Sequence, residues 1–356
     1  MTKITPADID DYSVKHGIHR HSVLELFAFE AFARRAAQVN QPFMLKGSLI
    51  TRQYLGPQEL ESSQRQVADL DWVYIVPVDT NNVNHIRVTL DNWLLAVTET
   101  HIDDGVRFRS FSENRFWRMI DYAMDDDFPT VNTDLLMWIG DEEFEFSLDV
   151  SLNLKIDPPP VPLLYKPISG EPFHLSYTVP LSLQIAWKLH QTIVRPRFKD
   201  LLNLIWLLRN NQIDIAAVWR ALCDECQHDK ADINLLKLLL DVDDPKTPGL
   251  SRHPLYTRKT KGYRGALINP DSLDEAWQSW RHSNVGGYRN NLASAQTMVH
   301  HVDLLPDNVY DVLKDIVHEL HQSGLASLIA AIGVPRVDKS WRNICSRIFK
   351  NNTTSS

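Results

Sequence analysis

Cysteine is scarce in this sequence, with three in 356 residues. So few thiols in a long chain cannot build the disulfide framework of a small secreted scaffold. We therefore expect a reducing environment and predict a cytoplasmic protein. Cys223 and Cys226 form a Cys-x-x-Cys pair, but the remaining ligands of a zinc site and the strand context of a redox motif are missing. We interpret them as cysteines on the surface of a helix.

Long apolar runs are also missing. The uncharged run at 324–334 has 11 residues, whereas a transmembrane helix needs about 18 or more, so we expect no association with a membrane.

Positive charge is not in excess either: 37 Lys and Arg residues stand against 45 Asp and Glu residues, a net charge of −8. This balance excludes a wholly basic coat for nucleic acid but permits a local basic surface.

The chain contains ordinary globular material with different patterns in its two halves. Residues 6–38 predict helices, and a further helix is expected at 84–98. Short strands are expected at 43–45, 67–78, 106–111, 135–139 and 144–152. In the last of these, apolar and polar residues alternate, which is typical of a strand with one buried face.

Beyond Pro180 the pattern becomes helical. Helices are expected at 181–193, 198–209, 213–241 in pieces, 272–281, 286–299, 307–322 and 324–332. The proline-rich stretch around 158–167 predicts an irregular connection between the halves. We therefore predict a bilobed α+β protein, with a mixed-sheet core in residues 1–175 and a helical C-terminal domain in residues 176–356.

Two acids inside a predicted strand are the first chemical signal. Asp69 and Asp71 are separated by one residue, and because side chains alternate along a strand, both carboxylates point to one face. Leu70 and Trp72 would then lie on the buried face. Two carboxylates on one face repel each other unless a cation lies between them, and Mg²⁺ prefers carboxylate and phosphate oxygens. The alternative interpretation is a solvated strand face.

A Gly-Ser pair precedes these acids. Gly47 and Ser48 follow Lys46, between a short apolar run and a helix-like segment. At a turn from strand to helix, glycine lets backbone N–H groups approach a phosphate closely, assisted by the serine hydroxyl. A Gly-Ser pair alone indicates little, but a Gly-Ser pair followed by Asp-x-Asp is typical of polymerase-β-type nucleotidyltransferases.

Asp149 lies on the polar face of the predicted strand at 144–152. As a third carboxylate it would complete a site for two metal ions about 3.5–4 Å apart, which activate an attacking hydroxyl and stabilise leaving pyrophosphate. An acid exposed to solvent on an edge strand is the alternative, and the sequence does not decide between the two.

Two charged residues stand out in the helical half. Lys188 lies within an apolar helical segment, where an ammonium group needs an anion, and a triphosphate would serve. Asp200 falls in the first turn of the next helix, a position that the helix dipole by itself makes favourable for a carboxylate.

A basic stretch without acids runs from 251 to 267, with Tyr256 and Tyr263 between its charges. Phosphate backbones and unpaired bases bind to such surfaces. Ordinary surface charge is the alternative. The RNA-binding candidates are Arg258, Lys259, Lys261 and Arg264.

In their order along the chain, these motifs resemble the AbiEii/AbiGii-type nucleotidyltransferase toxin family, which includes the MenT-like tRNA-modifying toxins. The resemblance covers roughly residues 20–210. The chain departs from the family's pattern at two positions: a single glycine precedes Ser48, and Val67 stands where the family has Ser or Thr.

The resemblance implies a polymerase-β-type nucleotidyltransferase core with a helical C-terminal lobe. It also implies Mg²⁺-dependent transfer of a nucleotide from an NTP, with two metal ions, to a tRNA 3′ end. The protein would then be the toxin of a toxin–antitoxin or phage-defence pair, with an antitoxin protein as partner. Two other functions stay open: transfer to a protein or small-molecule hydroxyl, and an inactive nucleotide-binding module.

Residue by residue, the resemblance assigns three roles. Lys46, Gly47, Ser48 and Arg65 would hold the nucleotide, and Lys188 would neutralise its triphosphate. Asp69 and Asp71 would bind the metal ions, with Asp149 as a third ligand. Asp200 would be an essential downstream acid. The catalytic set is therefore Asp69, Asp71, Lys188 and Asp200.

Overall fold

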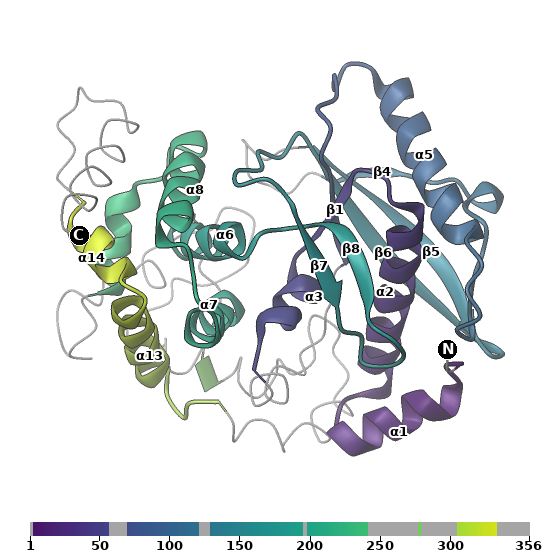
Figure 1. Cartoon of the computed structure of the whole chain (residues 1–356), viewed down its shortest axis with the longest axis horizontal. Coiled ribbons are helices and arrows are strands. Elements are labelled where there is room, and N and C mark those ends of the chain that lie inside the picture. The colour runs from purple at the N-terminus through teal and green to yellow at the C-terminus, as the bar shows by residue number, and fades with distance from the viewer. Residues whose placement is uncertain are drawn as a thin grey trace. The chain divides into compact units, whose positions relative to one another are not determined.

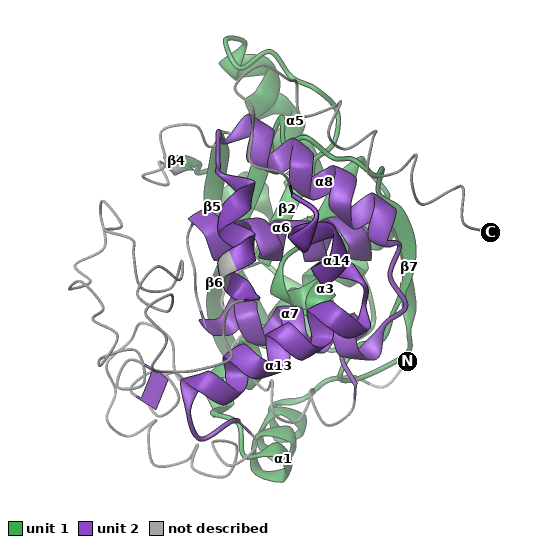
Figure 2. Ribbon diagram, turned by 90° about the vertical axis from the view of Figure 1, so that its left-hand side faces the viewer, with its two compact units in different colours: residues 1–53, 60–179, 285–301 green, residues 54–59, 180–284, 302–356 purple. Residues whose placement is uncertain are grey.

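The chain forms two compact units (Figure 2). The first comprises residues 1–53, 60–179 and 285–301, and the second residues 54–59, 180–284 and 302–356. A computed structural model describes residues 3–56, 70–120, 129–194, 198–240, 277–278 and 305–332. The predicted α+β class is confirmed, because a mixed sheet and several helices are present.

A mixed sheet organises the first unit. Its strands are β1 (Phe43–Lys46), β2 (Leu70–Tyr74), β3 (Val106–Phe108), β4 (Arg118–Ile120), β5 (Thr130–Ile139), β6 (Glu142–Leu152), β7 (Val161–Tyr165) and β8 (Phe173–Thr178). The strand order is β3-β5-β6-β2-β1-β8-β7, and β4 pairs with the other end of β5. The pairs β2–β6 and β1–β8 are parallel, and the other pairs are antiparallel.

Helices cover one face of this sheet (Figure 1). The helices of the unit are α1 (Pro6–His16), α2 (Arg20–Val39), the short α3 (Ser48–Thr51) and α5 (Val83–Glu99). On α2, Phe32 lies 6.0 Å from the Trp72 ring of β2 and 5.7 Å from the Trp93 ring of α5, each in edge-on geometry. Leu70 and Trp72 are buried as predicted, so the side chain of Asp71 belongs to the opposite face of the sheet.

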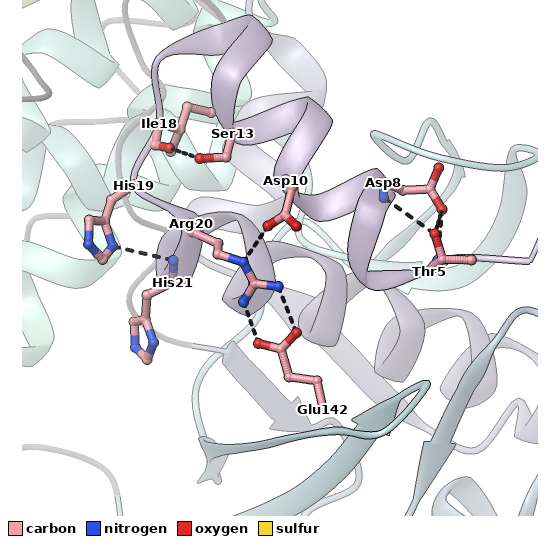
Figure 3. A network of polar contacts seen from close by, with 9 residues as sticks. All are labelled: Thr5, Asp8, Asp10, Ser13, Ile18, His19, Arg20, His21 and Glu142. Atoms are coloured by element: carbon pink, nitrogen blue, oxygen red, sulfur yellow. Dashed lines mark hydrogen bonds and ion pairs between the residues drawn. The ribbon is translucent and has the colours of Figure 1, made fainter.

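The N-terminal stretch at 6–38 forms helices as predicted, interrupted at Gly17, whose φ of +61° suits glycine. Beyond the interruption, Arg20 donates to Asp10 of α1 at 2.5 Å and forms a two-pronged ion pair with Glu142 of β6 (Figure 3). Arg20 therefore connects α1, α2 and the edge of the β5–β6 hairpin. These hydrogen bonds from Arg20 lower the pKa of the Glu142 carboxyl.

A buried ion pair ties α2 to the start of β3. The Arg35 guanidinium donates to both oxygens of Asp104, at 2.8 and 2.9 Å, and to the carbonyl of Val106 at 2.7 Å. Both side chains are almost fully buried. Removing one partner of such a pair leaves an uncompensated charge in the interior.

We therefore expect Asp104→Ala to lower the free energy of unfolding by about 3 kcal/mol, measured by urea denaturation. The neighbouring Asp103 is the matched control, because it forms an ion pair with Lys3 that is exposed on both sides. Asp103→Ala should leave stability nearly unchanged. Equal losses for the two variants would contradict a role for the buried pair.

A buried carboxylate holds the β7–β8 hairpin against α2. Glu30 accepts hydrogen bonds from the Tyr165 hydroxyl at 3.0 Å and from the Ile168 backbone N–H at 2.9 Å. Burial raises the pKa of Glu30 to about 7, against the smaller opposing effects of the Ile168 hydrogen bond and of the Arg52 charge.

This raised pKa makes stability depend on pH. The folded chain holds the Glu30 proton more tightly than the unfolded chain, so the contribution is full below about pH 4.5 and is lost as the pH rises through about 7. Relative to Glu30→Gln, the free energy of unfolding of the wild type should fall by on the order of 2 kcal/mol between pH 5 and 8. The exposed Glu145 supplies the control variant, Glu145→Gln. A difference between the wild type and Glu30→Gln that stays constant with pH would overturn the prediction.

The second unit is helical where it is described. Its elements are α6 (Leu181–Val194), α7 (Phe198–Asn210), α8 (Ile215–His228), the 3₁₀ helix η3 (Ile233–Leu239), α13 (Val309–Gln322) and α14 (Leu325–Ala330). Contacts join α6 to α7 and α8, and α7 to α13. Arg209 of α7 donates to Glu319 of α13 at 2.8 Å. Among the described residues, no helix is long and apolar enough to cross a bilayer.

Several boundaries differ from those predicted. The proline-rich region expected to be irregular contains β7 and is followed by β8. Pro162 is tolerated because β7 is the last strand in the order, and the register shifts between Val161 and Leu163. Strand β5 begins at Thr130, earlier than expected, and β3 ends at Phe108. Of the helices expected at 272–281 and 286–299, residues 277–278 are described and helical, and the rest lie outside the described residues.

Candidate functional site

A tight turn between β1 and α3 brings the backbone against a carboxylate. Gly47 has a φ of +78°, a conformation that glycine adopts without strain. A Cβ atom at this position would lie 2.4 Å from Oδ2 of Asp71. The Asp71 carboxylate can therefore pack directly against the turn because residue 47 has no side chain. Ser48, next in the chain, is the first residue of α3.

The two candidate acids of the first unit lie side by side. Strands β2 and β6 are parallel, and Asp71 is directly paired with Asp149 in their register. Paired residues of adjacent strands point to the same face, with backbones roughly 4.8 Å apart. Both acids are partly accessible. Asp149 therefore belongs to the same surface as Asp71, an arrangement that the sequence left open.

Lys46 extends this arrangement on the other side. It is directly paired with Asp71 in the antiparallel register of β1 and β2, and its Nζ lies 3.3 Å from Oδ1 of Asp71. Each of the two side chains is about one-fifth exposed, at 18% and 21%. The predicted nucleotide-binding lysine is therefore beside the carboxylates and partly accessible.

Two further residues continue the row, and the sequence analysis missed both. Asn132 of β5 is paired with Asp149, and Arg118 of β4 is paired with Asn132. The side chains are hydrogen bonded in the same order: Asn132 Nδ2 donates to Asp149 Oδ1 at 2.5 Å, and Arg118 Nε donates to Asn132 Oδ1 at 2.7 Å. A polar row thus crosses five adjacent strands: Lys46, Asp71, Asp149, Asn132 and Arg118.

The donor set of this row fits Mg²⁺ in its chemistry. Two carboxylates share one face, and the glycine turn lies directly against one of them. Hard oxygen ligands of this kind suit Mg²⁺, which needs only one or two protein carboxylates when phosphates complete its shell. Within the described residues, no group of three or more His, Cys, Asp or Glu side chains is placed to hold a metal ion. Asp69 and Arg65 lie outside the described residues.

In the second unit, the predicted site residues form an ion pair. Lys188 Nζ of α6 lies 3.3 Å from Oδ1 of Asp200 in the first turn of α7. Both side chains are largely buried, with exposures of 15% and 4%. The anion that the position of Lys188 demands is therefore supplied at least in part by Asp200. The RNA-binding candidates Arg258, Lys259, Lys261 and Arg264 lie outside the described residues.

The interpretation of the cysteine pair needs a correction. Cys223 and Cys226 lie on α8, but both are buried rather than at the surface. They belong to the apolar face that α8 presents to the interior, together with Val218, Trp219 and Leu222. Cysteine commonly behaves as a small apolar residue in such positions.

No protein-family model and no curated protein sequence matches the chain. Two solved structures from Helicobacter pylori align with most of it. JHP933 aligns with 88% of this chain and 98% of its own, at 13% identity and a TM-score of 0.38. A protein provisionally assigned as a nucleotidyltransferase aligns with 83% of this chain and 96% of its own, at 15% identity and a TM-score of 0.37.

Proposed function

We propose that the chain is a Mg²⁺-dependent nucleotidyltransferase. The observation that carries the proposal is the in-register pairing of Asp71 and Asp149 on one face of the sheet, with the Gly47 turn directly against Asp71. Paired carboxylates provide oxygen ligands for a metal ion, and the adjacent glycine turn offers backbone N–H groups that a phosphate can approach closely.

The reaction would join an acceptor hydroxyl to the α-phosphorus of an NTP. The new bond links the acceptor oxygen to this phosphorus, the bond to the bridging α–β oxygen breaks, and pyrophosphate leaves. Bound Mg²⁺ would neutralise phosphate charge and lower the pKa of the acceptor hydroxyl. Asp71 and Asp149, together with Asp69, would hold the metal ions. The Gly47 backbone and the Ser48 hydroxyl would contact phosphate oxygens, with Lys46 as the nearby positive charge.

The remaining roles rest on the resemblance in motifs. Arg65 would contact the nucleotide and Lys188 would neutralise the triphosphate. Asp200 would bind a metal ion or act as the general base that takes the proton of the acceptor hydroxyl. The acceptor would be an RNA 3′-hydroxyl, most simply of tRNA. The protein would then act as a toxin that blocks translation and would require a protein antitoxin.

Transfer of label from each α-³²P-labelled NTP tests the reaction, and the molecule that receives the label identifies the acceptor. The wild type is incubated with Mg²⁺ and total tRNA, and Asp149→Asn is run in parallel. The exposed Asp141, in the turn before β6, supplies the matched control Asp141→Asn. We expect label on RNA with the wild type and the control, and its loss in Asp149→Asn.

Other outcomes separate the remaining functions. Label on protein or on a small molecule would replace the RNA acceptor while keeping the chemistry. Nucleotide binding without pyrophosphate release, under every acceptor condition, would contradict the enzymatic proposal and indicate an inactive nucleotide-binding module.

A further inference from the structure

Asn132 is a buried polar residue within the candidate site. It lies on β5 with 5% of its surface exposed, directly opposite Asp149. Its Nδ2 donates to Asp149 Oδ1 at 2.5 Å. A buried amide of this kind is costly unless both of its ends find partners.

Arg118 fixes which way this amide points. Its Nε donates to Asn132 Oδ1 at 2.7 Å. A guanidinium can only donate hydrogen bonds, so the amide must turn its oxygen toward Arg118 and its NH₂ group toward Asp149. Arg118 therefore sets the donor-to-acceptor direction of both hydrogen bonds, from Arg118 to Asn132 and from Asn132 to Asp149.

Arg118 is itself held in place. Its Nη2 lies 2.5 Å from Oδ1 of Asp134, which also accepts a hydrogen bond from the Ser147 hydroxyl at 2.7 Å. The guanidinium carbon lies 5.5 Å from the centre of the Phe116 ring. These contacts restrict the rotation of Arg118, although 45% of its side chain is exposed.

The type of donor matters for the chemistry. Lysine or arginine at position 132 would place a positive charge directly on the Asp149 carboxylate and offset the charge that attracts a divalent metal ion. A neutral amide instead holds one carboxylate oxygen while the negative charge of the group is retained. Partners of this kind orient metal-binding side chains and strengthen metal binding about 10- to 100-fold.

We propose that Asn132, oriented by Arg118, is a positioning residue that fixes the Asp149 carboxylate for binding of a divalent metal ion. This inference rests on the proposed function, because it assumes that Asp149 is a metal ligand. It assigns no contact with substrate to Asn132 or to Arg118.

Binding of Mn²⁺ to the purified protein tests the inference without any measurement of activity. Free Mn²⁺ is followed by electron paramagnetic resonance during titration of the wild type and variants. Asn132→Leu removes the donor at nearly constant volume and should raise the Kd for Mn²⁺ about 10- to 100-fold. Thr130→Val is the matched control, because Thr130 is buried two residues earlier on the same strand and face. Its Kd should equal that of the wild type.

A second variant, Arg118→Met, tests the inference even if Asn132→Leu fails to fold. It keeps a long apolar side chain at a half-exposed position and removes the donor that fixes the amide. We expect about a threefold to tenfold rise in Kd, smaller than for a direct partner of a metal ligand because Arg118 acts through Asn132. Circular dichroism checks that each variant is folded.

Three results are decisive. Weakened binding in Asn132→Leu and Arg118→Met, but not in Thr130→Val, supports the inference. Binding in the wild type that is weakened by Asp149→Asn but unchanged in Asn132→Leu and Arg118→Met overturns the inference and leaves the proposed function standing. Absence of Mn²⁺ binding in the wild type overturns both.

Discussion

Asp71→Asn is expected to reduce nucleotidyl transfer at least about a thousandfold, because the metal ions that Asp71 would help to hold in the proposed reaction would contribute several kcal/mol to the stabilisation of the transition state. Asparagine keeps the size of the side chain but removes the charge that faces Lys46 at 3.3 Å. Circular dichroism and the melting temperature check that the variant is folded under the conditions of the assay. Initial rates of pyrophosphate release at saturating NTP measure the effect.

Asp79→Asn is the control for this prediction. Asp79 is exposed in the loop that follows β2, and its carboxylate accepts hydrogen bonds from Asn81. Its rate should stay within threefold of the wild type. A rate for Asp71→Asn within tenfold of the wild type would remove Asp71 from the catalytic machinery, whatever the function of the protein.

Gly47→Ala is expected to have the second largest effect. The new methyl group would meet Oδ2 of Asp71 at 2.4 Å, so the carboxylate or the turn must move. A displacement of about 1 Å at a reacting centre costs on the order of a hundredfold in rate. The φ of +78° adds about 1–2 kcal/mol of backbone strain, which lowers stability as well.

Gly170→Ala separates these two causes. Gly170 has a similar φ of +82°, but a Cβ atom added there would meet only the end of the Arg34 side chain, at 3.4 Å. The two variants should lose similar amounts of stability, while only Gly47→Ala loses activity and affinity for Mn²⁺. Full activity in Gly47→Ala would show that the contact between the turn and Asp71 has no part in catalysis.

Local patterns predicted much of this fold. The alternation along 144–152 gave strand β6 with its buried face, and the spacing of Leu70, Asp71 and Trp72 placed the acid opposite the core. The helices α5, α6, α7 and α13 begin and end within a few residues of the predicted positions. In each case the signal lies within one segment of the chain.

Pairing between distant segments could not be predicted in the same way. Strands β2 and β6 are far apart in the sequence. No local pattern determines which residue of β6 lies beside Asp71 of β2. The sequence therefore left two interpretations of Asp149, and the register favours the one in which it joins Asp71. Asn132 was missed for a related reason, because the polar residues Thr130, Asn132 and Asp134 masked the start of β5.

Other differences between the predictions and the structure concern which side chains are buried and what they contact. The sequence predicted that Lys188 needs an anion, but not that Asp200 would supply one at 3.3 Å. A contact between Lys188 and a triphosphate stays a prediction. The cysteines of α8 were assigned to a helix surface once a zinc site and a redox motif had been set aside, whereas the helix turns both thiols inward.

The proposed role of Asp71 and Asp149 as metal ligands is tested most directly by a crystal structure of the protein grown or soaked with Mn²⁺ and a non-hydrolysable NTP analogue. Anomalous scattering locates the metal independently of any assay. We expect a Mn²⁺ ion bound by the carboxylates of both Asp71 and Asp149, with phosphate oxygens completing its shell beside Gly47. Nucleotide bound without metal at these acids, or Mn²⁺ bound only elsewhere, would contradict it.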